Sequence, residues 1–185
     1  ALKNTSDVMY RIKELAMQAA NDTLGPQDRQ SVALELSSLK DQVLSLANSQ
    51  DSNGNYLFAG SRTGVPAFEK DASGHVQYQG DQARMQVNVG DSRRMSLNMP
   101  GSDVYTRVVR DDGKGGKTGV NFFQALDDLV TAVKAGDQAH MQRGIAEVDT
   151  LQSGISDGLG QVGSDLTIVD MQTTVLDQVV LQLKT

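Results

Sequence analysis

Residues 158–163 have the residue types of a dinucleotide-binding loop, because they read G-x-G-x-x-G. In such a loop the glycines let backbone amides at the start of a helix approach a pyrophosphate, and a strand must come directly before them. The residues before Gly158 have helical apolar spacing instead, and Leu159 and Val162 continue that spacing through the motif. We therefore predict a continuous helix here and no cofactor site.

A second stretch, Gly116-Lys117-Thr118, resembles the end of a phosphate-binding loop. That loop requires another glycine five positions before Gly116, where this sequence has Asp111, and an apolar strand leading into it. The carboxylates of Asp111 and Asp112 would also repel a phosphate. Because residues 111–119 contain no apolar side chain, the sequence predicts a mobile surface loop.

The other side chains with catalytic or metal-binding potential are not arranged in sets. His75 and His140 are the only histidines, and neither has a spaced partner ligand. Asp127 and Asp128 are adjacent, and adjacent residues on a helix do not face each other. The chain has no cysteine, which excludes disulfides, thiolate metal sites and cysteine nucleophiles. We therefore predict no enzyme, no cofactor and no metal site.

The net charge of −6 is distributed unevenly along the chain. Residues 56–119 hold nine Lys and Arg against seven Asp and Glu, whereas the rest of the chain holds eight against sixteen. The acidic part has no basic face and the chain has no tryptophan, so we expect no nucleic-acid partner. No run approaches the roughly 18 apolar residues that span a bilayer, so we expect no membrane insertion.

The spacing of apolar residues predicts long helices on either side of the middle segment. From Met141 to Leu183, apolar residues recur at alternating steps of four and three, interrupted at Gln152 and Thr173. A mean period of 3.5 residues is typical of a helix with one continuous apolar seam. We therefore predict a long C-terminal helix over 137–185, and three further helices over 3–21, 26–50 and 121–136.

Residues 56–119 have a different pattern. Short stretches with alternating apolar residues are separated by turn-forming residues, and five of the eight aromatic side chains lie here. This pattern predicts an antiparallel sheet or small barrel with its own aromatic core. The expected fold class is α+β: an elongated antiparallel helical bundle of residues 1–55 and 120–185, with an inserted small antiparallel β domain of residues 56–119.

The seam residues are the apolar side chains that we expect to hold the bundle together. They are Ile12, Leu15, Leu36, Leu39, Val43, Ile145, Ile155, Leu159, Val162, Leu166 and Val169. Beside the seam, the C-terminal helix has several glycines, each of which costs about 1 kcal/mol relative to alanine but allows another backbone to come close. We expect neighbouring helices or subunits to approach most closely at Gly154, Gly158, Gly160 and Gly163.

Particular residues also resemble a known family. Met9 to Thr23 resembles the N-terminal helical domain of bacterial flagellins. Gly54 to Ser61, followed by Pro66-Ala67-Phe68, resembles the branch of the flagellin family that is located at the junction of the flagellar hook and filament. The stretches 76–81, 101–105 and 121–137 resemble the same branch.

The resemblance implies a structural protein that is secreted and assembles in the extracellular flagellum. The implied partners are other copies in a ring, a sister junction protein on the hook side, flagellin on the filament side, the flagellar export machinery and a dedicated chaperone. It also implies that this sequence is the core of a longer chain, which alone would be monomeric. Arg11 and Glu14 would then be subunit contacts. Two alternatives are filament flagellin itself and a secreted helical binding module or effector.

Overall fold

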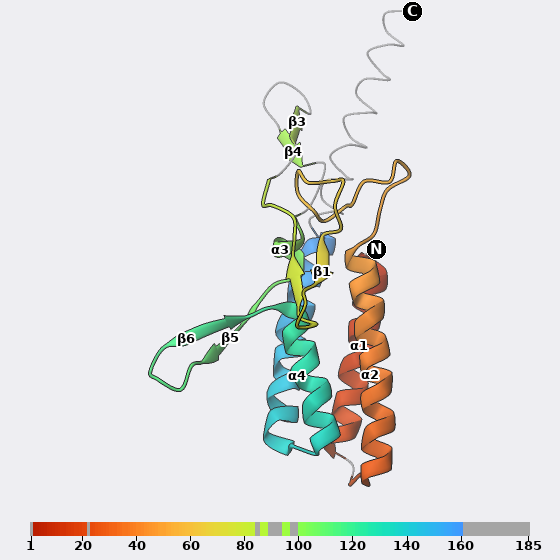
Figure 1. Cartoon of the computed structure of the whole chain (residues 1–185), viewed down its shortest axis with the longest axis vertical. Helices are drawn as coiled ribbons and strands as arrows, with labels where there is room; N and C mark the ends of the chain where they lie inside the picture. The colour runs from red at the N-terminus through yellow and green to blue at the C-terminus, as the bar shows by residue number, and fades with distance from the viewer. Residues whose placement is uncertain (1, 22, 84–85, 89–93, 97–99, 161–185) are drawn as a thin grey trace, which may run out of the picture.

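The structure is a computed structural model that describes residues 2–21, 23–83, 86–88, 94–96 and 100–160, with only the backbone described for 86–88 and 94–96. Four helices form an elongated bundle (Figure 1). They are α1 (Leu2–Asn21), α2 (Pro26–Ala47), α4 (Phe122–Ala135) and a helix that covers residues 138–160, here called the C-terminal helix. The described residues of the segment between α2 and α4 contain six short strands. The α+β class predicted from the sequence is confirmed.

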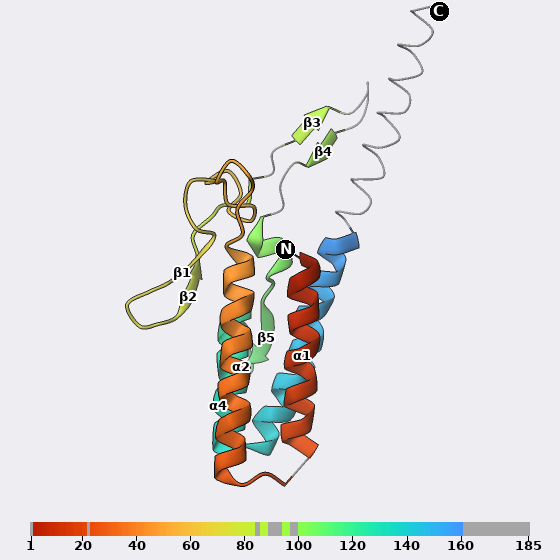
Figure 2. The same cartoon turned by 90° about the vertical axis from the view of Figure 1, so that its right-hand side faces the viewer.

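Contacts between the helices define an antiparallel order. Arg11 of α1 pairs with Glu35 of α2, and Lys40 of α2 pairs with Asp127 of α4. The C-terminal helix returns along α1, because Gln152 Nε2 donates to Ser6 Oγ at 2.7 Å. Helices that are neighbours in this order therefore run in opposite directions, as Figure 2 shows.

The helix ends follow the local signals in the sequence. Pro26 occupies the first turn of α2, where its missing N–H is not needed. Asn121 caps α4 by accepting a hydrogen bond from Gln124 N at 2.8 Å, and Gly136 ends it in the left-handed conformation at φ 66°. Asp137 Oδ1 accepts from His140 N at 3.2 Å and caps the C-terminal helix. These predicted boundaries are confirmed.

The six strands form three separate two-stranded antiparallel hairpins. They are β1 (Phe68–Lys70) with β2 (Val76–Tyr78), β3 (Gln86–Asn88) with β4 (Arg94–Ser96), and β5 (Val108–Asp111) with β6 (Lys117–Val120). A four-residue helix, α3 (Gly101–Val104), precedes β5. The predicted antiparallel pairing is confirmed, but within the described residues the strands form separate hairpins rather than one sheet or barrel, because each strand is only three or four residues long and pairs with one neighbour.

The predicted mobile loop at residues 111–119 is also wrong, since these residues form the tip and one strand of the β5–β6 hairpin. Side-chain chemistry stabilises the turn although it has no apolar residue. Asp112 Oδ1 accepts hydrogen bonds from Lys114 N at 2.7 Å and from Gly116 N at 3.0 Å. Gly115 supplies the positive φ that the turn requires, at 83°.

The same five-residue turn, D-x-x-G-x, occurs twice more. In residues 51–55 and 71–75, the aspartate Oδ1 likewise accepts from the backbone N–H groups two and four positions later. In both, the glycine has a positive φ, 82° at Gly54 and 84° at Gly74. The sequence therefore specifies these chain reversals locally, without help from the core.

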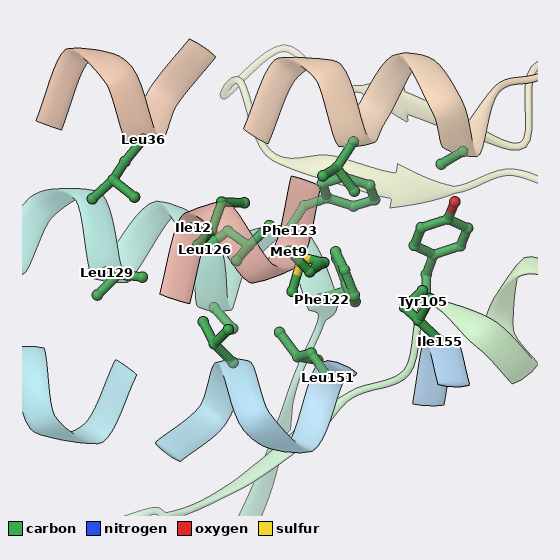
Figure 3. Close-up of a cluster of buried hydrophobic side chains, with 14 of the residues drawn as sticks. Met9, Ile12, Leu36, Tyr105, Phe122, Phe123, Leu126, Leu129, Leu151 and Ile155 are labelled. Carbon is green, nitrogen blue, oxygen red and sulfur yellow. The ribbon is translucent and has the colours of Figure 1, made fainter. Parts of the chain in front are cut away.

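An aromatic cluster connects the inserted segment to the bundle. Tyr105 is at its centre, and its ring lies 5.4 Å from Phe68 and 5.2 Å from Phe122. Its hydroxyl is within hydrogen-bond distance of Thr5 Oγ1 in α1, at 3.2 Å, and burial raises the pKa of Tyr105 to about 12. Phe122 and Phe123 of α4 belong to this cluster (Figure 3). The aromatic side chains of the middle segment therefore pack against one another, as expected, but they form one cluster with Phe122 and Phe123 of the bundle.

The buried face of the C-terminal helix is displaced from the predicted one. Its buried residues recur at steps of three and four and are Met141, Gly144, Val148, Leu151, Ile155 and Gly158, with Glu147 at one side. Leu151, which the predicted row omits, is fully buried (Figure 3). Gly144 and Gly158 lie within the buried face rather than beside it. Residues 161–185, which the predicted helix included, lie outside the described residues.

Candidate assembly surface

The predicted seam residues fall into three groups. Ile12, Leu15, Leu36, Val43 and Ile155 are buried, each with at most 3% of its surface exposed. Leu39, Ile145 and Leu159 are partly buried and pack against the core from its edge. Val162, Leu166 and Val169 lie outside the described residues. Figure 3 shows how Ile12, Leu36, Leu126, Leu129 and Leu151 meet from four different helices.

The C-terminal helix contacts different elements on its two sides, which explains why its buried face is centred on Leu151. On one side it meets α1, where Lys13 and Asp149 form an ion pair at 2.5 Å. On the other side it meets β5 and the chain before it, near Glu147 and Gly154. A helix that is covered on two sides buries a wider stripe than the narrow seam of a two-stranded coiled coil.

Arg11 and Glu14, the predicted subunit contacts on α1, lie on the bundle surface. Arg11 donates to Glu35 Oε1 at 3.0 Å and to Glu14 Oε1 at 3.2 Å. The hydrogen bond to Glu35, together with both carboxylates, raises the pKa of Arg11. The Arg11 side chain retains 44% exposure and that of Glu14 retains 71%, so both are accessible to a neighbouring molecule.

The predicted glycine contacts have three different environments. A Cβ at Gly154 would lie 2.9 Å from Thr106 Oγ1 and 3.1 Å from Val104 O, so the segment before β5 approaches the helix closely there. Gly158 is buried. Gly160 is exposed, and a Cβ at this position would have nothing within 4 Å. Gly163 lies outside the described residues.

A polar network fastens the β5–β6 hairpin to the bundle. Arg110 of β5 donates two hydrogen bonds to Glu147 of the C-terminal helix, both at 2.7 Å, from Nε and Nη2. Its Nη1 donates to Asp128 of α4 at 2.6 Å. Asp128 also accepts from Gln124 Nε2 at 2.8 Å. Glu147 and Asp128 together raise the pKa of Arg110, and the three charged side chains connect one strand with two helices.

Five large apolar side chains are exposed on the described part of the molecule. They are Tyr10, Met17, Leu34, Leu57 and Val109. Tyr10 and Met17 are seven residues apart and therefore share the outer face of α1. Val109 is the most exposed of the five, at 69%. The sequence did not predict the exposure of Val109, because β5 and its pairing with β6 were not predicted.

The described part of the chain contains no group of three side chains that could together hold a metal ion. His140 Nδ1 pairs with Asp137 within one helical turn, and this contact lowers the pKa of Asp137. Among the same residues, no helix is long and apolar enough to cross a membrane.

Comparisons with known proteins identify the class. Residues 1–63 match the family described as the bacterial flagellin N-terminal helical region. Flagellin FlaB1 of Treponema pallidum is 37% identical over 101 residues, which is 53% of this chain and 35% of that protein. The resemblance found in the sequence is thereby confirmed, and residues 1–63 correspond to the N-terminal helical region of bacterial flagellins.

The similarity extends further to one branch of the family. Flagellar hook-associated protein 3 of Escherichia coli is 30% identical over 169 residues, which is 87% of this chain and 52% of that protein. The crystal structure of Xanthomonas campestris FlgL has the same fold, with a TM-score of 0.88 at 24% identity over 99% of this chain and 89% of that one. The chain spans about half the length of the curated hook-associated relatives that it matches.

Proposed function

We propose that the chain is a non-enzymatic structural subunit of the bacterial flagellum that connects the hook to the filament. The extent of the sequence similarity carries this proposal. Hook-associated protein 3 matches 87% of the chain, whereas filament flagellin FlaB1 matches 53%. The greater extent of the first match favours the junction role over the filament role.

The proposed partners follow from a position between the flagellar hook and the filament. Other copies of the chain would form a ring, with a sister junction protein on the hook side and flagellin on the filament side. The protein would reach this position by secretion through the flagellar export machinery, escorted before export by a dedicated chaperone. The absence of cysteine suits this route, because no disulfide can hinder an unfolded chain.

Within the subunit, we propose that the buried seam residues hold the bundle together and that polar and small residues on its surface meet neighbouring copies. Arg11, Glu14 and Gly160 are exposed and available for such contacts. Gly154 and Gly158 face the interior of this chain, so we propose for them, in the first place, close packing within the subunit. Gly163 stays a proposed subunit contact on the basis of its sequence position alone.

Deletion of the gene tests the proposed function. We expect cells that retain hooks, lack filaments and release flagellin into the medium, because filament subunits would have no base on which to assemble. Electron microscopy of the cells and an immunoblot of the medium measure both effects. Restoration of filaments by the wild-type gene is the control, and intact filaments in the deletion strain would contradict the proposal.

Filament flagellin is the second candidate, favoured by the 37% identity of FlaB1 over 101 residues. A filament subunit should polymerise alone into long filaments when the full-length protein is purified and seeded. A junction subunit should not grow beyond a short ring on the same seeds. Filament length by electron microscopy separates the two candidates.

A further inference from the structure

We propose that the β5–β6 hairpin is a docking arm whose outer face binds a second copy of this chain. The inference rests on the proposed function, because it names one surface through which copies would meet. Figure 1 shows the hairpin extending sideways, away from the bundle. Two properties that a docking arm needs are present together: a firmly held base and an uncovered outer face.

The base of the arm is held by the polar network and by apolar packing. Strand residues alternate between two faces, so Val108 and Arg110 point to the same side. Val108 is 3% exposed, and Arg110 binds Glu147 and Asp128 of two helices. An isolated two-stranded hairpin is marginally stable in water. Its attachment to α4 and the C-terminal helix therefore fixes the direction in which the arm points.

The opposite face of the arm is uncovered. It carries Val109 and Asp111 of β5, opposite Gly119 and Lys117 of β6, with Arg107 directly before β5. Val109 is 69% exposed. On one side of it is the Asp111–Lys117 ion pair. On the other side is the Arg107 side chain, whose Cδ would lie 3.5 Å from a Cβ added at Gly119. Within the described residues, this sheet has only two strands, which leaves one backbone edge of each strand without a strand partner.

Charge indicates the partner. Residues 107–120, the arm, hold four Lys and Arg against two Asp, whereas the residues outside 56–119 hold sixteen Asp and Glu against eight Lys and Arg. Within 137–160, Asp157 is exposed, while Asp137, Glu147 and Asp149 already pair with His140, Arg110 and Lys13 of the same copy. A basic arm and an acidic bundle on one molecule are complementary between two copies, and a heterologous contact of this kind repeats around a ring.

The chain has no cysteine, so one introduced cysteine reports on one site. In the full-length protein, Val109→Cys tests the arm, and Leu34→Cys, at a residue 61% exposed on the outer side of α2, is the matched control. Each variant is reacted with a maleimide in intact flagella and again after the same flagella are dissolved into monomers. We expect assembly to slow the reaction at position 109 by about tenfold or more relative to position 34, because docking would cover the arm.

A photocrosslinker attached at position 109 identifies what covers the arm. A product with the mass of two copies of this chain supports the proposal, and the charge reversal Lys114→Glu should reduce its yield. A product with flagellin or with another protein overturns it, and so does equal slowing at positions 109 and 34. If the wild-type protein is missing from flagella, the proposed function fails. If it is present but position 109 reacts as fast as in monomers, only the docking arm fails.

Discussion

Arg110 donates hydrogen bonds to carboxylates from two helices. The Arg110 side chain is only 15% exposed, and the Glu147 side chain is 10% exposed. A charge that is withdrawn from water in this way is stable only while its partners remain ionised and in place. Neither carboxylate could be paired with Arg110 from the sequence, because Asp128 and Glu147 lie 18 and 37 residues away.

Glu147→Gln should destabilise the fold by about 2–3 kcal/mol. The change keeps the shape of the side chain but removes the negative charge that accepts two hydrogen bonds from the Arg110 guanidinium. Urea unfolding followed by circular dichroism measures the loss. Asp149→Asn is the control, because Asp149 is 54% exposed in its pair with Lys13 and should cost about 1 kcal/mol or less. Equal effects of the two changes would contradict the structural role of Arg110.

Asp81 predicts a pH effect. Its carboxylate accepts hydrogen bonds from the Ser61 hydroxyl and backbone N–H and from Ala83 N, and these bonds lower the pKa of Asp81 below its ordinary value of 3.8. Folding therefore favours the ionised form. Its stabilising contribution should be complete above about pH 5 and should disappear as the pH falls through the folded-state pKa.

Thermal melts from pH 6 to pH 3 test this effect. The Asp81→Asn variant should melt at a lower temperature than the wild type at pH 6, and the difference between the two melting temperatures should shrink toward pH 3. Asp157→Asn, a change at an exposed carboxylate on the bundle, provides the comparison. A difference that stays constant across the pH range would show that ionisation of Asp81 does not contribute.

At the scale of elements, the helices were predictable because single residues determine where several of them begin or end. Pro26, Asn121 and Gly136 act through backbone geometry and capping, which operate without tertiary contacts. The β5–β6 hairpin was missed because its turn is stabilised by Asp112 and its strand by Arg110, so hydrophobic patterning carries no signal there.

The displaced face of the C-terminal helix leads to a prediction about two leucines. Leu151 is fully buried whereas Leu159 is only partly buried, although the heptad row included Leu159 and omitted Leu151. Leu151→Ala should cost about 3–5 kcal/mol, at the upper part of the range for core leucines, and Leu159→Ala clearly less. Chemical unfolding of both variants measures which loss of stability is larger. A larger loss for Leu159→Ala would support the buried face that was predicted from the sequence.

At the scale of the whole molecule, the aromatic cluster makes the inserted segment and the bundle share one core. The predicted division at residues 119 and 120 crosses the end of β6, and Tyr105 from one side packs against Phe122 and Phe123 from the other. Aromatic composition located Tyr105 in the middle of the chain but could not show that the rings of α4 complete its surroundings.

Tyr105→Ala should therefore destabilise both parts together, by about 3–5 kcal/mol for the loss of a buried aromatic side chain. Hydrogen exchange should become faster in residues 56–80 and at the adjoining ends of α1 and α4. Tyr10→Ala, which removes a tyrosine that is 60% exposed, is the control. Faster exchange in residues 56–80 alone would mean that the two parts unfold independently.

The antiparallel pairing of α1 with the C-terminal helix has a mechanical consequence. Leu2 and Gly160 lie at the same end of the bundle, and the contacts between the two helices follow one another from that end: Ser6 with Gln152, Lys13 with Asp149, and the Ala20 carbonyl with Gln138. A tension applied at Leu2 and Gly160 would load these contacts one at a time and peel the helices apart. A compression along the bundle axis would load all four helices at once, so the molecule should resist being pushed far better than being peeled.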